Sequence, residues 1–181
     1  MKRGALAAVL MGLAFGACYE FDFPLDPKPQ VPVDAPLIGA WRCLAASADL
    51  DEPPLTLRIE QKSQWIMNWS TESRSSDGVT EKDGYEVHGS SLKGGALLNV
   101  RELGERADDR WSFVRYTFLL PYLLRLQVVD DEPFAKEKGS AKALRQALEK
   151  RRNDPVIYGD LCVCLRVKTS PVPSPMPSPR L

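Results

Sequence analysis

The residues best suited to chemistry in this chain are four cysteines and a single histidine. Cys18 lies near the start of the chain, and the other three cysteines, Cys43, Cys162 and Cys164, lie in its body. Two cysteines separated by one residue, with a distant His88, do not form a recognisable metal-ligand set. We therefore expect no metal and no cofactor. Instead we expect ordinary buried or disulfide-linked cysteines, with Cys43 joined to Cys162 or to Cys164, because spacing alone leaves the partner open.

The sequence contains no arrangement typical of a catalytic site. A Gly-x-Ser-x-Gly elbow, a phosphate-binding loop and a His-Glu-x-x-His motif are all missing from it. His88 has no partner nearby in the sequence, so we expect it on a strand or at the surface. The acidic run 130–132 lacks the spaced oxygen ligands of a calcium loop and is expected to be a solvated turn. We therefore expect a protein that is not an enzyme.

The first residues have the three zones of an export signal. Residues 2–3 are basic, residues 5–15 form an apolar run, and the small pair Gly16 and Ala17 precedes Cys18. The apolar run is shorter than the ~20 residues that a membrane-spanning helix needs. Residues 1–17 are therefore predicted to be a cleaved signal peptide.

This ending resembles the lipobox of bacterial lipoproteins, although Phe15 stands where that motif usually carries leucine. The resemblance implies cleavage before Cys18, a diacylglyceryl thioether on its sulfur and acylation (such as palmitate) of the new amino terminus. Two or more acyl chains give stable attachment, at about 0.8 kcal/mol per buried CH₂. Tyr19 follows Cys18, in place of the aspartate that often retains lipoproteins at the inner membrane. We expect a lipid-anchored protein of the cell envelope, with the outer membrane favoured.

Proline-rich segments flank the body of the chain. Residues 18–36 have neither a helical nor an alternating pattern, and they are predicted to be a lipidated, extended spacer of about 3.1 Å per residue. Residues 169–181 repeat this composition and are predicted to be a disordered tail. Residues 37–168 remain as one domain. The chain has 24 basic and 24 acidic residues without a basic patch, which argues against nucleic acid as a partner.

The body of the chain alternates apolar and polar residues in short runs. In residues 55–61, Leu55, Leu57 and Ile59 share one face, which is typical of a half-buried strand. One helix is expected at 141–152, because Ser140 is a good N-cap and two leucines lie four residues apart. The predicted strands are 37–45, 55–61, 64–70, 79–89, 96–103, 111–119, 122–130 and 156–167.

Short links between about eight strands indicate antiparallel neighbours, since parallel pairing needs long crossovers. Closing such a sheet into a barrel removes its exposed edges. The sequence therefore predicts a mainly β fold, an antiparallel barrel with one helix before the last strand. A two-sheet sandwich is the alternative.

The order of these elements over residues 37–168 resembles the lipocalin and wider calycin group. The first strand carries the Gly-x-Trp of that group as Gly39 and Trp41, and a helix precedes the final strand. The resemblance implies that Trp41 packs across one end of the barrel. It also implies an interior that holds one small ligand or is filled by side chains.

Several aromatic residues are candidates to line such an interior. They are Trp65, Trp69, Trp111, Phe113 and Tyr116. Our first hypothesis is a barrel that binds a small hydrophobic ligand, which requires a cavity of about 300 Å³ or more. Our second is an interaction, scaffold or inhibitor protein with a filled core that contacts another envelope protein. The apolar runs 118–120 and 122–124 flank Pro121, so this hairpin tip is a candidate contact with a membrane or partner.

Overall fold

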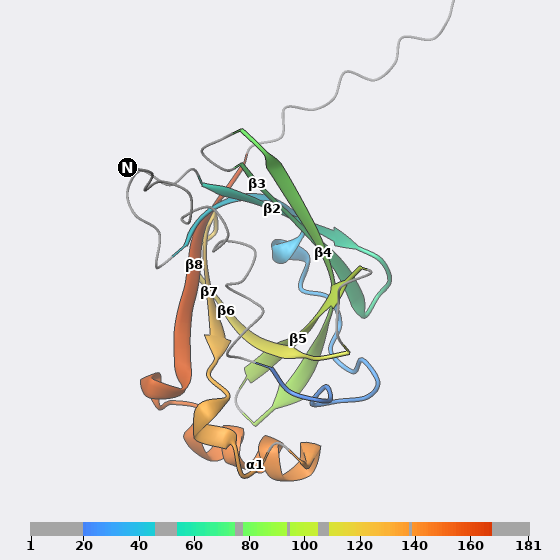
Figure 1. Cartoon of the computed structure of the whole chain (residues 1–181), viewed down its shortest axis with the longest axis vertical. Helices are drawn as coiled ribbons and strands as arrows, with labels where there is room; N and C mark the ends of the chain where they lie inside the picture. The colour runs from blue at the N-terminus through green and yellow to red at the C-terminus, as the bar shows by residue number, and fades with distance from the viewer. Residues whose placement is uncertain are drawn as a thin grey trace, which may run out of the picture.

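The computed structural model describes residues 20–45, 54–74, 78–93, 95–104, 109–137 and 139–167. Eight antiparallel strands follow one another around a closed barrel, and the last strand pairs with the first (Figure 1). The strands are β1 (Gly39–Ala45), β2 (Leu55–Gln61), β3 (Ile66–Arg74), β4 (Thr80–Leu92), β5 (Gly95–Leu103), β6 (Ser112–Leu120), β7 (Leu123–Val129) and β8 (Tyr158–Arg166). The predicted barrel is therefore confirmed, and the alternative sandwich is not formed.

Alternation along the strands places apolar side chains inside the barrel. In β2, Leu57 and Ile59 are buried inside, whereas Arg58 and Glu60 are exposed outside. The other strands contribute inward side chains in the same way, because successive residues of a strand point to opposite faces. The resulting lumen cluster includes Leu37, Trp41, Cys43, Leu57, Ile59, Met67, Trp69, Tyr85, Val87, Leu98, Val100, Val114, Leu124, Leu126, Cys162 and Cys164.

A second apolar core lies on the outside of the barrel, under helix α1 (Ala141–Arg151). The Ser140 side chain caps this helix by accepting a hydrogen bond from the Ala143 amide at 3.3 Å. Leu144 and Leu148 lie on its inner face and are fully buried, which contributes about 1.5–3 kcal/mol for each leucine. The outer cluster consists of Phe21, Leu25, Leu92, Leu97, Phe113, Val129, Phe134, Leu144, Leu148, Ile157 and Tyr158.

The chain before β1 is packed against the barrel, and we call residues 20–38 the N-terminal strap. The strap overlaps the predicted extended spacer 18–36, and its described residues are docked on the barrel. Phe21, Leu25 and Leu37 are at most 3% exposed, because each places a large apolar side chain into one of the two clusters. The prolines between them prevent regular structure, as expected, but they do not prevent burial.

The strap first crosses the outside of the barrel and then enters one of its ends. Phe21 and Trp111 exchange two backbone hydrogen bonds of 2.8 Å, and Val31 forms an isolated bridge with Gly89. The short 3₁₀ helix η1 (Ala35–Leu37) follows and brings Leu37 into the lumen cluster. Figure 1 shows η1 within the ring of strands. We call the end of the barrel that residues 31–37 occupy the mouth.

Within the described residues, no helix combines the length and the apolar composition needed to cross a membrane. The predictions for the signal peptide, for Cys18 and for the tail 169–181 concern residues outside the described part of the chain.

Candidate functional site

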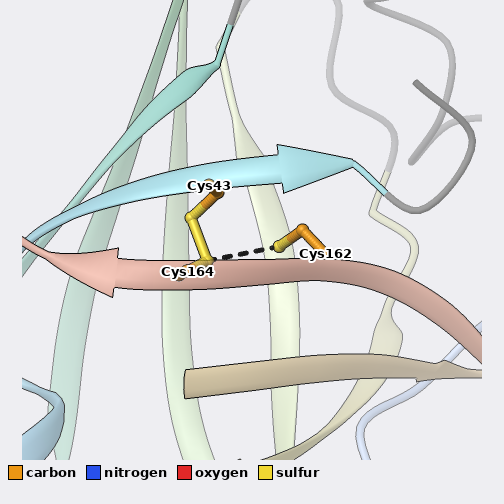
Figure 2. A group of neighbouring side chains, drawn as sticks. All are labelled: Cys43, Cys162 and Cys164. Atoms are coloured by element: carbon orange, nitrogen blue, oxygen red, sulfur yellow. Dashed lines mark hydrogen bonds between the residues drawn. A yellow bond between two sulfur atoms is a disulfide. The ribbon is translucent and has the colours of Figure 1, made fainter. Parts of the chain in front are cut away.

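Three cysteines meet inside the barrel (Figure 2). Cys43 of β1 and Cys164 of β8 lie directly opposite each other in the strand pairing and form a disulfide, with their Cα atoms 3.9 Å apart. This settles which of the two pairings that the sequence left open is formed. The bond joins the first strand to the last, across 121 residues, where the sheet closes on itself.

Cys162 is the remaining thiol of this group and has its own environment. Its Sγ lies 3.4 Å from the Sγ of Cys164, on the same buried face of β8. Burial raises the pKa of the Cys162 thiol to about 12, because the lumen does not solvate a thiolate. At neutral pH this sulfur is therefore a poor nucleophile, since only the thiolate reacts readily.

The three sulfur atoms all lie within 4.8 Å of one another, which is close enough for shared coordination of an ion. Two of them are already bonded to each other, and a thiolate is the form that binds metal. The apolar residues around the group would also leave its charge unsolvated. The arrangement therefore acts as a buried cross-link beside a protonated thiol.

A small recess remains at the mouth of the barrel. Trp65, Met67 and Tyr116 line it from the barrel, and strap residues close it from the other side. The Tyr116 hydroxyl donates a hydrogen bond of 3.0 Å to the Asp34 carboxylate. Burial, followed by the nearby Asp34 charge, raises the pKa of Tyr116 to about 12. The recess has a volume of about 10 Å³, about enough for one water molecule.

The aromatic residues predicted to line a cavity do not form one group. Trp65 and Tyr116 lie together at the recess, with Trp65 36% exposed in the turn before β3. Trp69 lies deeper in the lumen cluster, and its buried Nε1–H has no hydrogen-bond acceptor among the described residues. Trp111 and Phe113 require a correction because they pack in the outer cluster, outside the lumen. The alternation of β6 puts Val114 inside and therefore Phe113 outside.

Gly39 and Trp41 are at the beginning of β1, beside η1. Trp41 is fully buried, and its Nε1 donates a hydrogen bond of 2.9 Å to the Leu37 carbonyl. The Arg166 guanidinium lies 4.5 Å from the centre of the Trp41 rings, and it also donates a hydrogen bond to the Ile38 carbonyl. Gly39 has a φ of +141°, a conformation that side chains oppose. These contacts hold the end of the strap at the mouth.

Sequence reasoning missed the polar group that holds the strap on the outside of the barrel. Asn99 is fully buried on β5, and its Oδ1 accepts a hydrogen bond of 2.8 Å from the Leu25 amide. Its Nδ2 donates to the His88 carbonyl and to the Ser90 hydroxyl. An asparagine in an outward position of a strand gives no sequence signal for this role, because such positions are ordinarily solvated.

His88 also contacts the strap on the outside of the barrel. Its Nε2 lies 3.1 Å from the Asp26 carbonyl oxygen, and its ring packs edge-on against Trp111. Burial lowers the pKa of His88, which favours the neutral imidazole. The histidine therefore faces the docked strap.

Comparisons with protein-family models, with curated proteins and with solved structures found no match for this chain.

Proposed function

We propose that this protein is a lipid-anchored interaction protein of the bacterial cell envelope, whose filled barrel works through its outer surface. One observation favours this function over the binding of a hydrophobic ligand. The strap occupies the mouth, and the recess left there is about 10 Å³, whereas a ligand site needs about 300 Å³ or more. In this reading the barrel is a rigid, non-catalytic module, and its partner is an envelope protein or the membrane itself.

The proposed location is supported by two separate features. The start of the chain resembles a lipoprotein signal that ends at Cys18. The Cys43–Cys164 disulfide is typical of an oxidising compartment outside the cytoplasm. The strap is docked from Glu20 onward, two residues after Cys18, so at most roughly 7 Å of chain would separate the lipid attachment point from the docked strap. We favour the outer membrane because Tyr19 follows the cysteine.

Native mass spectrometry tests the filled barrel. A chain that begins at Tyr19, exported in its own host behind an ordinary cleavable signal, should have the mass of the polypeptide with one disulfide. A stoichiometric additional small molecule would contradict the proposal and restore ligand binding as the function. The intact mass of the wild-type chain tests the anchor separately, because acylation of Cys18 adds the mass of the lipid. A mature chain without that mass would contradict lipid anchoring.

Binding of a small hydrophobic ligand remains a second candidate because of one observation. The Trp69 Nε1–H is buried in the lumen without an acceptor in the described part of the chain, and a ligand carbonyl would satisfy it. Such a ligand requires the strap to leave the mouth. Fatty acid added to the chain that begins at Tyr19 should then change the fluorescence of Trp69, and a Trp69→Phe variant of that chain should lose the change. If the fluorescence does not respond at saturating fatty acid, this candidate fails.

A further inference from the structure

Exposed apolar side chains gather on the outside of the barrel where β7, β8 and β1 meet. We call this surface the β8 patch, and its members are 41–57% exposed. It consists of Leu44, Leu120, Tyr122, Val163, Leu165 and Val167.

The strand pairing makes these side chains neighbours. Leu44 lies opposite Val163 between β1 and β8, and Leu165 lies opposite Leu123 between β8 and β7. The hairpin tip joins the patch at its end, because the Arg166 amide donates a hydrogen bond to the Tyr122 carbonyl. Single exposed apolar residues are ordinary, but a contiguous group marks an interaction surface.

The apolar face of β8 is outside because the cysteines occupy its inner face. Cys162 and Cys164 point into the lumen, so the alternation of the strand sends Val163 and Leu165 outward. Threonine or lysine would suit these outward positions in a barrel exposed only to water. The apolar side chains at these positions are therefore unnecessary for the core.

Unpaired positive charge accompanies the patch. Arg42 is exposed on β1, directly opposite Leu165 of the patch. Arg58 is exposed on β2 opposite Ala40, and the Ala40 carbonyl accepts a hydrogen bond from the amide of Val167 in the patch. Among the described residues, neither arginine takes part in an ion pair.

The carboxylate on β8 itself is already neutralised. Asp160 of β8 accepts hydrogen bonds from Arg125 and Gln127, with a shortest Arg125 contact of 2.5 Å. The Arg125 side chain beside Asp160 holds the pKa of that carboxyl below its usual range. The β8 patch therefore presents apolar side chains beside the Arg42 guanidinium, which has no ion-pair partner among the described residues.

We infer that the β8 patch rests on an anionic lipid bilayer. Leucine and valine side chains can enter the boundary between headgroups and acyl chains, and tyrosine is suited to that boundary. Arginine buries its stem along apolar surface and keeps its charge among the phosphates. This combination fits a charged membrane surface better than an apolar protein groove. The inference rests on the proposed envelope location, but its test does not need the anchor.

Vesicle sedimentation with the chain that begins at Tyr19, which lacks both the signal peptide and the lipidated cysteine, tests the inference. The chain should bind vesicles of phosphatidylcholine with phosphatidylglycerol, and should bind vesicles of phosphatidylcholine alone more weakly. Arg42→Gln should lower affinity for the anionic vesicles about fivefold, which corresponds to about 1 kcal/mol per arginine near such a surface. Leu165→Ser should lower affinity about tenfold, because a side chain no longer enters the bilayer.

Matched controls separate the patch from general effects. Arg74→Gln makes the same change in net charge at an exposed site of β3, and Leu103→Ser removes a leucine that is 44% exposed on β5. Both should bind as the parent chain does, and thermal unfolding should show that all four variants are folded. Equal affinity of Leu165→Ser and Leu103→Ser would overturn the inference, as would no binding of the parent chain. A dimer that Leu165→Ser dissociates would assign the patch to a second copy instead. None of these results depends on whether Cys18 is acylated, which the intact mass decides.

Discussion

The Cys43–Cys164 disulfide should contribute more to stability than any other pair of side chains in the lumen. It closes a loop of 121 residues, so its removal restores conformational freedom mainly to the unfolded chain. Replacing both cysteines with alanine should lower the free energy of unfolding by about 2–5 kcal/mol in urea titrations at neutral pH. Cys162→Ala is the matched control and should cost about 1 kcal/mol, since it removes one buried sulfur and no cross-link. Equal losses would show that the bond adds nothing beyond packing.

The Cys162 thiol makes stability depend on alkaline pH. Its pKa is raised from 9 to about 12 by burial, so the folded chain keeps a proton that the unfolded chain releases. A raised pKa of an acid means that the unfolded state binds fewer protons between about pH 9 and pH 12. Stability should therefore fall as the pH rises through this window. Above pH 9, the free energy of unfolding of the parent should fall relative to that of Cys162→Ala, which lacks the titrating thiol. A difference independent of pH would contradict this.

The strap is the element whose docking depends most on a single backbone position. A Cβ added to Gly89 would lie 2.8 Å from the Cβ of Val31, closer than real side chains approach. Gly89→Ala should therefore displace residues 31–37 from the mouth and cost about 1–3 kcal/mol. Hydrogen exchange should accelerate in the strap while β6 and β7 remain protected. Gly95→Ala on the adjacent strand β5 is the control, because nothing lies within 4 Å of the added atom. If the two variants exchange alike, the strap does not depend on Gly89.

The strands could be predicted from the sequence, and the strap could not. The alternating pattern predicted β2 at residues 55–61, as observed, and the helical pattern predicted the end of α1 to within one residue. Both predictions succeed because burial of one face imposes a regular period on the sequence. The strap has no period, since its Phe21 and Leu25 are fixed by contacts with distant residues such as Asn99. The sequence predicts the last strand at 156–167 but not its orientation, because Val163 and Leu165 are apolar and yet exposed. Only the disulfide partner shows which face is inside.

The described part of the molecule contains two apolar cores on opposite sides of one sheet. The lumen cluster is closed by the pairing of β8 with β1, and the outer cluster is closed by α1. The strap contributes to both, since Phe21 and Leu25 enter the outer cluster and Leu37 enters the lumen cluster. Arg145 of α1 also donates to the Asp26 carboxylate of the strap at 2.6 Å. Strap, helix and barrel should therefore unfold as one cooperative unit.

Resistance of the disulfide to reduction should be a property of this whole unit. Cys43 and Cys164 are both fully buried in the lumen cluster, so an external thiolate reaches neither sulfur while the barrel is closed. Reduction then has to wait for an opening that costs a large part of the free energy of unfolding. The rate of reduction can be measured with excess dithiothreitol, by alkylating the released thiols and recording the intact mass. Reduction of the folded chain in water should be more than about a thousandfold slower than reduction of the unfolded chain in urea. This ratio is expected for a domain whose stability is ~5 kcal/mol or more. Reduction at nearly the unfolded rate would mean that the pairing of β1 with β8 opens by itself. In that case the barrel would be closed by the bond alone and not by its packing.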